Sequence, residues 1–274
     1  MGIKVGKHEL GGPGGFFLIA GPCVIEDAAL TLEIAEKLAE ISAGFGIPLI
    51  FKASCIKANR SSVDSFTGPG MDEGLEILAK VRREIGIPVT SDVHCRNDVG
   101  AASQVLDMLQ VPAFLSRQTE LILSVAREGK ALNIKKGQFM SPGEAKLAAL
   151  KAASTGNRNV MLTERGTFFG YGDLVVDMRG LVGMKESGFP VVYDATHSVQ
   201  KPAGLGKSSG GDRAMIFPLM RSAVAAGVDG VFFETHPEPE TALCDGPSML
   251  PLEEAGSFIS QALRIREVMD ENRE

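Results

Sequence analysis

Short apolar runs recur along the chain, and each is followed by a longer segment in which apolar residues return at helical spacing. Eight runs have the length and the apolar character of strands that are buried on both faces. They are 16–21, 48–54, 88–93, 108–113, 131–136, 159–166, 190–197 and 230–236. Strands of this kind that alternate with helices predict a parallel sheet covered by helices.

Two of the intervening segments illustrate how the helices are specified. Behind Asp27, a suitable N-cap, four apolar residues lie at helical spacing: Leu30, Ile34, Leu38 and Ile41. The last helix is predicted over 251–270, and its apolar face carries Leu252, Ala255, Ile259, Ala262 and Leu263. Both patterns predict amphipathic helices that pack one face against the sheet.

Eight strand–helix units in 274 residues predict a (β/α)8 barrel of the α/β class, with a doubly wound open sheet as the alternative. No linker rich in Pro, Gly or Ser divides the chain, so we expect 1–274 to be a single barrel domain. Residues 1–15 are expected to be an N-terminal extension, in which 3–15 form a hairpin or a plug over the barrel floor.

Composition narrows the classes of function. The net charge of −6 argues against a nucleic-acid scaffold, because phosphate backbones are usually bound by a basic face. No run approaches the roughly 20 apolar residues that span a membrane, and the N-terminus lacks the apolar core of a signal peptide. The four cysteines form no disulfide-type framework. These features predict a reduced, cytoplasmic protein whose partner is neither a nucleic acid nor a membrane.

The barrel hypothesis also predicts where functional polar residues gather. Active sites of this fold lie at the carboxyl ends of the strands. The eight predicted ends carry Cys23; Lys52 and Lys57; Asp92; Gln110 and Arg117; Lys135 and Lys136; Glu164 and Arg165; Asp194 and His197; and Glu234. Because charged residues are rarely buried without partners, their convergence at one end predicts a polar pocket.

One subset of these residues is cationic: Lys52, Lys57, Arg60, Arg117, Lys135 and Arg165. Several cations converging in an acidic protein predict a site for anions, such as phosphates and a carboxylate. The loop KANRSS, 57–62, adds amide, guanidinium and hydroxyl donors. The glycine-rich segment 201–213 is expected to be a mobile lid or a phosphate-contacting loop. For Lys80 and Lys136, a solvated surface position stays open.

A second subset has the residue types of metal ligands: Cys23, His197, Glu234 and Asp245. In a closed barrel the first strand lies beside the eighth, so these side chains are expected to be neighbours. Thiolate, imidazole and carboxylate together suit Zn²⁺, Fe²⁺ or Mn²⁺ better than Mg²⁺. His94 with Cys95, and His236, are alternative ligands. For Cys55, Cys95 and Cys244 we prefer a packing role.

Six segments together resemble the 3-deoxy-D-manno-octulosonate 8-phosphate synthase family: KANRSS, NIKKGQF, LTERGTFFGYGDLVVD, YDATHSVQ, GLGKSSGG and FFETHPEPE. The similarity runs from about Phe17 to the final helix. It implies a (β/α)8 homotetramer that condenses phosphoenolpyruvate with arabinose 5-phosphate and water. The products are the 8-phosphate and inorganic phosphate, for the inner core of lipopolysaccharide.

The resemblance also implies residue roles. Phosphoenolpyruvate would be held by Lys52, Lys57, Lys135 and Arg165, and the sugar phosphate by Asn59, Arg60 and Ser61, with Arg117 reaching in from a neighbouring subunit. Ser54 and Gln110 are expected to join the binding residues, and the expected catalytic residues are Lys57, Asp92, Lys135 and His197. Cysteine at position 23 is similar to the family's metal-dependent branch, whereas asparagine there marks the metal-independent one.

Three other functions remain open. The sister family, 3-deoxy-D-arabino-heptulosonate 7-phosphate synthase, has a Lys-Pro-Arg-Thr-type motif where this chain has Lys57-Ala58-Asn59-Arg60, and it uses erythrose 4-phosphate. A metal-dependent aldolase on the same barrel would release no phosphate. A sugar-phosphate binder without catalysis would not need both a cation cluster and a complete ligand set.

Overall fold

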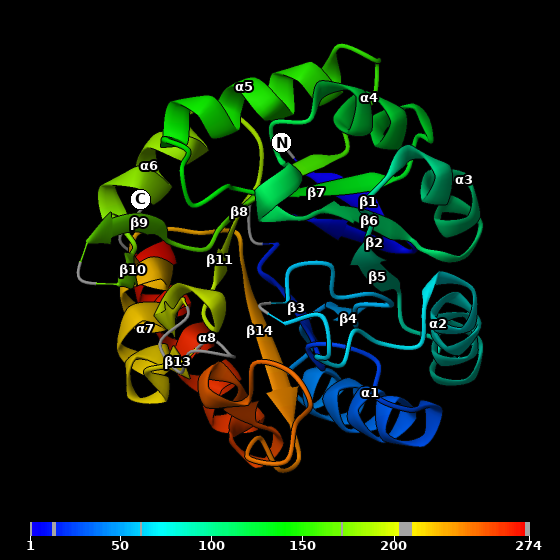
Figure 1. Ribbon diagram of the computed structural model, residues 1–274. Helices are drawn as coiled ribbons and strands as arrows, with labels where there is room; N and C mark the ends of the chain where they lie inside the picture. Colours follow the sequence, from blue (N-terminus) through cyan, green and yellow to red (C-terminus); the bar gives the residue numbers. More distant parts are fainter. Residues whose placement is uncertain (1, 13–14, 61, 171, 203–209, 272–274) are drawn as a thin grey trace.

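The structure is a computed structural model that describes residues 2–12, 15–60, 62–170, 172–202 and 210–271. Within these ranges, eight parallel strands form a barrel (Figure 1): β3 (Phe17–Gly21), β4 (Leu49–Lys52), β5 (Val89–Asp92), β6 (Met108–Val111), β7 (Ala131–Lys135), β8 (Val160–Glu164), β11 (Val191–Asp194) and β14 (Gly230–His236). Strand β14 pairs with β11 on one side and with β3 on the other, which closes the ring. The (β/α)8 barrel is therefore confirmed, and the open sheet is wrong.

Helices surround the ring of strands (Figure 1). They are α1 (Ala28–Gly44), α2 (Met71–Ile85), α3 (Arg96–Val105), α4 (Thr119–Arg127), α5 (Pro142–Ala153), α6 (Met178–Lys185), α7 (Ile216–Ala225) and α8 (Ala255–Glu271). Asp27 caps α1 as predicted, since its side chain accepts a hydrogen bond from the backbone N–H of Leu30 at 2.9 Å. Within the described ranges, no helix combines the length and the apolar character needed to cross a membrane.

The final helix begins later than its apolar pattern predicts. Residues Leu252–Glu254 form a 3-10 turn (η5), and α8 starts only at Ala255. Leu252 is nevertheless buried, so the apolar spacing marks the packed face more accurately than the first helical residue.

Two apolar cores result from the closed ring. The larger one lies between the strands and the helices, where the outward-facing side of the barrel meets α1–α8. The smaller one lies inside the barrel floor and consists of Ile3, Val5, Leu10, Phe17, Ile19, Ile50, Met108, Ala131, Met161, Val192 and Phe232. Three of these residues, Ile3, Val5 and Leu10, come from the N-terminal segment, which thus packs against the bottom of the barrel.

That N-terminal segment is the predicted hairpin. Strands β1 (Ile3–Val5) and β2 (His8–Leu10) pair antiparallel, with Ile3 opposite Leu10. The backbone N–H of Lys4 donates to Asn159 Oδ1, just before β8 begins. The hairpin therefore covers the amino ends of the barrel strands, opposite the end where the polar residues gather.

The loops after the strands contain small elements that the sequence pattern does not predict. Strands β9 (Thr167–Gly170) and β10 (Asp173–Val175) form a hairpin after β8. The short strand β15 (Leu250–Pro251) pairs parallel with the end of β14. Short 3-10 turns add η1 (Ala113–Leu115), η2 (His197–Val199), η3 (Arg213–Met215) and η4 (Gly246–Ser248). In the predicted lid, β12 (Gln200–Lys201) pairs with β13 (Gly210–Gly211), and 203–209 lie outside the described residues.

We expect the hairpin to stabilise the barrel through its buried face. Leu10→Ala should lower the free energy of unfolding by roughly 2–5 kcal/mol, because it empties a packed position in the barrel floor. Glu9→Ala is the matched control, since Glu9 is exposed on the same strand. Urea unfolding followed by circular dichroism measures both, and equal stabilities for the two variants would show that the hairpin does not seal the floor. If 1–274 form one domain, as we propose, a single transition is expected.

Candidate active site

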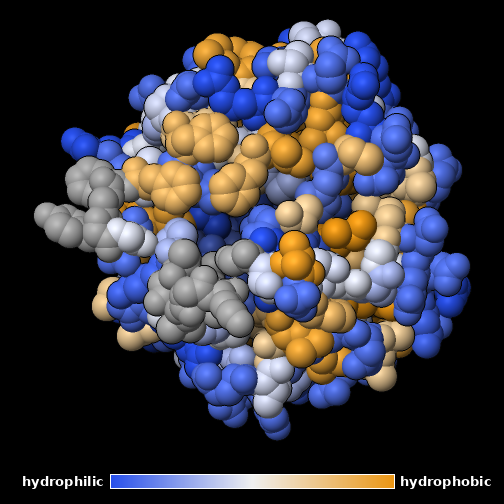
Figure 2. Space-filling view, viewed as in Figure 1, coloured by the Kyte–Doolittle hydropathy of each residue, from blue (hydrophilic) through white to orange (hydrophobic). Residues whose placement is uncertain are grey.

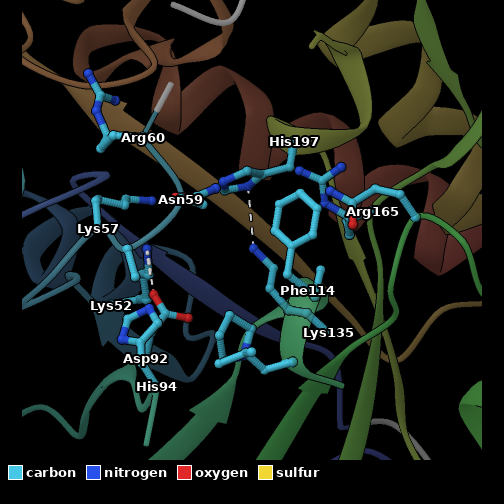
Figure 3. Close-up of a pocket in the computed structure, with 15 residues that line it drawn as sticks. Lys52, Lys57, Asn59, Arg60, Asp92, His94, Phe114, Lys135, Arg165 and His197 are labelled. Atoms are coloured by element: carbon cyan, nitrogen blue, oxygen red, sulfur yellow. Dashed lines mark hydrogen bonds and ion pairs between the residues drawn. The ribbon is translucent and has the colours of Figure 1, made fainter. Parts of the chain in front are cut away.

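A pocket of about 570 Å³ opens at the carboxyl ends of the barrel strands. Figure 2 shows hydrophilic residues in the hollow of this face and apolar ones near its rim. Three half-exposed aromatic residues follow barrel strands at this end: Phe114, Phe139 and Phe168. The predicted cations Lys52, Lys57, Arg60, Lys135 and Arg165 all line the pocket, together with Asn59, Asp92, His94 and His197 (Figure 3).

Three of the predicted substrate-binding residues lie elsewhere. Ser54 and Gln110 are buried below the pocket, where both contact Asp92. Arg117 is exposed outside the pocket and pairs with Glu144 at 2.9 Å. Ser61 lies outside the described residues. The polar pocket predicted from the strand ends is therefore present, but Ser54, Gln110 and Arg117 do not line it in this chain.

The carboxylate of Glu234 is almost fully buried beside the pocket. Its Oε1 accepts from Lys52 Nζ at 2.8 Å, and Lys57 Nζ lies 3.5 Å from the same oxygen. Burial alone would raise the pKa of Glu234, but the charges of His197, Lys52 and Lys57 hold it well below its usual range. Burial likewise opposes the charge on both lysines, yet their anionic neighbours raise the pKa of each. Both lysines are thus charged and available to an anion.

A second charged group surrounds Asp194, at the end of β11. Its Oδ2 lies 2.6 Å from Lys135 Nζ and 2.8 Å from His197 Nδ1. Its Oδ1 accepts from the backbone N–H groups of Thr196 and His197, which fixes the turn η2. Burial lowers the pKa of His197 and of Lys135, despite the nearby carboxylate. Asp194 holds His197 with Nε2 directed at Glu234, 3.6 Å away.

Asp194 was assigned no role among the predicted site residues. The sequence gives one signal for it, since it stands at a strand end three residues before His197. A carboxylate that orients a histidine through Nδ1 is common beside metal-binding and catalytic histidines.

Below the pocket, a ladder of polar side chains crosses the inside of the barrel. Asp92 accepts from Ser54 Oγ and from Gln110 Nε2, both at 2.7 Å. Gln110 Oε1 accepts from Asn133 Nδ2 at 2.8 Å, and Asn133 Oδ1 accepts from Thr163 Oγ1 at 2.7 Å. Each residue comes from β5, β6, β7 or β8, or from the end of β4. The ladder fixes Asp92 at 3.8 Å from Lys52 Nζ and so positions the cations above it.

The structure decides one open alternative, at Lys136, and corrects one expectation, at Cys95. Lys136 is buried rather than solvated: its ammonium group donates to Met140 O and Thr167 Oγ1, and Glu164 lies 3.4 Å away. It ties the loop after β7 to the hairpin that follows β8. Cys95 is exposed at the start of α3 instead of packed, whereas Cys55 and Cys244 are buried as expected. Lys80 is half-buried.

The four predicted metal ligands converge on one side of the pocket. Ligand atoms of His197, Glu234 and Asp245 lie within 4.8 Å of one another, and Cys23 Sγ is 3.5 Å from Asp245 Oδ2. The donors fit a first-row divalent ion, because soft sulfur, imidazole and carboxylates meet in a buried place. Burial raises the pKa of the Cys23 thiol, so its thiolate requires a strong positive charge nearby. A divalent cation is such a charge.

The alternative ligands do not join this group. His236 Nδ1 accepts from the backbone N–H of Glu238, and its Nε2 faces Glu26 at 3.8 Å. His94 lines the pocket on the side of Asp92, and Cys95 donates toward Asp98. Among the described residues, two groups of ligand atoms lie close enough to share an ion: one is His197, Glu234 and Asp245, and the other is Cys23, Cys244 and Asp245.

Two arginines add to the cations that line the pocket. Arg165 donates through Nη2 to Gln200 at 2.9 Å, while its buried Nη1 has no hydrogen-bond partner within the described part of the chain. Arg60 donates to Cys244 Sγ and to the carbonyl of Leu243. A buried guanidinium N–H that lacks a partner is costly, so the free Nη1 of Arg165 points to an anionic ligand.

Comparisons with known proteins identify relatives along nearly the whole chain. The sequence model of the DAHP synthetase I family matches residues 3–271. A protein of Trichlorobacter lovleyi named 2-dehydro-3-deoxyphosphooctonate aldolase is 53% identical over 94% of this chain and 95% of its own length. Proteins with the same name are 56% identical in Desulfatibacillum aliphaticivorans, over 94% and 93%, and 52% identical in Syntrophotalea carbinolica, over 99% and 98%.

The buried ion pairs predict a pH dependence of stability. The charges of Lys52 and Lys57 outweigh burial and hold the pKa of Asp92 below its usual range. The folded state therefore binds this proton more weakly than the unfolded state, and stability present above pH ~4 is lost as the pH falls. Below pH ~4 the free energy of unfolding of the wild type should therefore fall by about 1.4 kcal/mol per pH unit more steeply than that of Asp92→Asn, which lacks this carboxylate.

Urea unfolding at a series of pH values between about 5 and 3 measures this contribution. Asp72→Asn is the control, because Asp72 is an exposed carboxylate in the first turn of α2. Parallel curves for wild type and Asp92→Asn would contradict the assignment of an ionised, paired Asp92.

Proposed function

The chain belongs to the DAHP synthetase I family, and we propose that it condenses phosphoenolpyruvate with D-arabinose 5-phosphate and water. The products would be 3-deoxy-D-manno-octulosonate 8-phosphate and inorganic phosphate. The relatives' name, 2-dehydro-3-deoxyphosphooctonate aldolase, denotes the same eight-carbon keto acid phosphate, with its keto group at C2 and no hydroxyl at C3. This agreement supports the resemblance seen in the sequence motifs.

The observation that carries the proposal is the spread of cations across one pocket. Lys52, Lys57, Lys135 and Arg165 line its depth, while Asn59 and Arg60 come from the loop after β4. A pocket of about 570 Å³ has room for two small phosphorylated molecules. Two anionic substrates need two groups of cations that approach each other, which this arrangement supplies.

We propose that the deep cations hold phosphoenolpyruvate. Its carboxylate and phosphate would face Lys52, Lys57, Lys135 and Arg165, and the unpartnered Nη1 of Arg165 would donate to one of them. The phosphate of the sugar would bind Asn59 and Arg60 nearer the mouth. We also propose Ser61, the next residue in the sequence, as a ligand of this phosphate. This order leaves C3 of phosphoenolpyruvate facing the sugar aldehyde.

Arg117 supports a site shared between subunits. Its guanidinium lies on the outside of its own barrel, in contact with Glu144 rather than with the pocket. We propose that in a homotetramer it completes the sugar-phosphate site of a neighbouring subunit. Exposed Phe114, three residues earlier and at the pocket rim, would lie at the same boundary.

The reaction joins C3 of phosphoenolpyruvate to the aldehyde carbon while water adds at C2. The resulting hemiketal phosphate expels phosphate by cleavage of its C–O bond. Positive charge develops at C2 and negative charge at the aldehyde oxygen, so fixed charges of both signs accelerate the step. Holding two reactants in contact supplies a further large contribution.

The chain's own residues suit these charges. Lys135 would stabilise and protonate the aldehyde oxygen, because burial lowers its pKa and makes its proton easier to give. Asp92 is a weak base, since nearby lysines hold its pKa low, and we assign it the electrostatic stabilisation of positive charge at C2. Lys57 would neutralise the departing phosphate. His197, fixed by Asp194, would serve as a metal ligand.

We propose that Cys23, His197, Glu234 and Asp245 hold a divalent transition metal, Zn²⁺, Fe²⁺ or Mn²⁺. Such an ion would supply a Lewis acid that orients and polarises the sugar aldehyde. We further propose that the enzyme acts in the cytoplasm, where its product enters the synthesis of the lipopolysaccharide inner core.

The condensation predicts release of inorganic phosphate that requires both substrates. With phosphoenolpyruvate and arabinose 5-phosphate together, a colorimetric assay should detect phosphate, and with either alone it should not. Erythrose 4-phosphate is the control acceptor, because the matching family is described by the name of the sister synthase, which uses that sugar. We expect it to react poorly, since this chain has Lys57-Ala58-Asn59-Arg60 in place of the sister enzyme's Lys-Pro-Arg-Thr-type motif. Faster turnover with erythrose 4-phosphate would assign the sister reaction instead.

Metal dependence is tested by removal and return of the ion. Chelation should abolish turnover, and added Zn²⁺, Fe²⁺ or Mn²⁺ should restore it, because the ion would orient and polarise the sugar aldehyde. Cys23→Asn should weaken metal retention, measured by elemental analysis after dialysis. The control is Cys95→Ser, which changes an exposed thiol outside the ligand group. Undiminished activity after verified metal removal would refute the assignment.

A further inference from the structure

The ligand group contains a second sulfur that neither the sequence motifs nor the relatives' names assign. Sγ of Cys244 lies within 4.8 Å of both Cys23 Sγ and a carboxylate oxygen of Asp245. We propose that Cys244 is a direct ligand of the metal, so that the ion is held through two sulfurs. This inference rests on the proposed metal site and concerns which atoms of this chain form it.

The distances are compatible with one shared ion. Two sulfurs that each bond to zinc at about 2.3 Å lie at most about 4.6 Å apart, so only a small adjustment is required. The four ligands expected from the sequence do not all lie this close to one another: His197, Glu234 and Asp245 form one group, and Cys23, Cys244 and Asp245 form another. Asp245 is common to both. The ligand atoms that lie close to Cys23 Sγ are therefore those of Asp245 and Cys244.

The backbone is shaped to bring Cys244 and Asp245 to the same side. In extended chain, successive side chains point to opposite sides. Asp245 instead has φ of +49°, in the left-handed region, and it is the one non-glycine residue with positive φ among those described. Such strained backbone is typical of ligand-binding sites. A Cβ on the next residue, Gly246, would lie 2.2 Å from Pro239 O, so the loop packs too tightly to shift easily.

Cys244 also has the surroundings of a ligating sulfur. It is almost fully buried, and its Sγ accepts a hydrogen bond from Arg60 Nη1 at 2.7 Å. Metal-bound sulfurs retain lone pairs for such hydrogen bonds, and donors around them tune the metal. Arg60 is also a proposed ligand of the sugar phosphate. The same guanidinium would thus contact both the metal's sulfur ligand and the second substrate.

Two sulfurs change which ion the site prefers. Thiolates favour Zn²⁺ and other soft ions, whereas Mn²⁺ is better served by carboxylate and water. With Cys244 included, the site should prefer Zn²⁺ or Cd²⁺ to Mn²⁺ more strongly than a site with one sulfur. The inference therefore narrows the class of metal as well as the ligand set.

The test counts sulfurs on the metal without substrate. Metal-free protein, kept reduced, is loaded with Co²⁺, and the near-ultraviolet sulfur-to-cobalt absorption is compared among wild type, Cys23→Ser, Cys244→Ser and the double variant. Each single variant should keep about half of the wild-type absorption, since one of two cobalt–sulfur bonds is lost, and the double variant none. Cys95→Ser should match wild type.

Two further measurements guard against variants that fold poorly. X-ray absorption of the zinc-loaded wild type should give two sulfurs at about 2.3 Å. The ratio of Cd²⁺ to Mn²⁺ affinity should fall roughly tenfold or more in Cys244→Ala. One sulfur on zinc, with full cobalt absorption in Cys244→Ser and none in Cys23→Ser, would overturn the proposal. Because no substrate is added, failure here is separate from failure of the condensation, which the phosphate assay on wild type detects.

Discussion

The site depends on the pairing of the buried Glu234 carboxylate with the cationic and imidazole groups around it. A carboxylate this deep in a protein is costly unless cations and donors surround it. Its partners come from distant parts of the chain: Lys52 from the end of β4, Lys57 from the loop beyond, and His197 from the turn after β11. Only a closed barrel places β14 beside both β3 and β11, so ring closure and charge compensation require each other. The proposed anion site and the proposed metal site therefore share one carboxylate.

The inside of the barrel is layered because side chains alternate along each strand. Strand β7 passes through all the layers: Ala131 lies in the apolar floor, Asn133 in the polar ladder, and Lys135 in the pocket. Strands β6 and β8 contribute a floor methionine and a ladder residue in the same way. The hairpin packs on the apolar end, whereas the pocket opens at the charged end. Because every second residue of a strand points into the barrel, the same strands supply the apolar floor at one end and the polar pocket at the other.

Much of this organisation could be predicted from the sequence, because apolar runs with polar ends report directly on buried strands. All eight strands and the cations at their ends follow from that rule. The Asp27 cap follows from the helical spacing of the apolar residues behind it. The rule for strands fails where burial depends on the loops. Lys135 and Lys136 look alike in sequence, yet Lys136 is buried only because the loop after β7 and the β9–β10 hairpin fold over it. Asn133 and Thr163 read as ordinary strand residues, since their hydrogen bonds run between strands. Cys244 acquires its neighbours through a left-handed turn that no periodicity signals.

The pairing of charges inside the pocket would let the proposed site bind anions without rearranging. Two of the buried carboxylates are held by further hydrogen bonds: Asp92 by Ser54 and Gln110, and Asp194 by backbone N–H groups. These bonds hold the carboxylates in place, and the carboxylates in turn hold Lys52 and Lys135. An entering phosphate or carboxylate can then approach the open side of cations that are already ionised and fixed. Because the dipoles and charges are set before the substrates arrive, little energy is spent on reorganising them during the reaction, which is the condition for strong electrostatic catalysis.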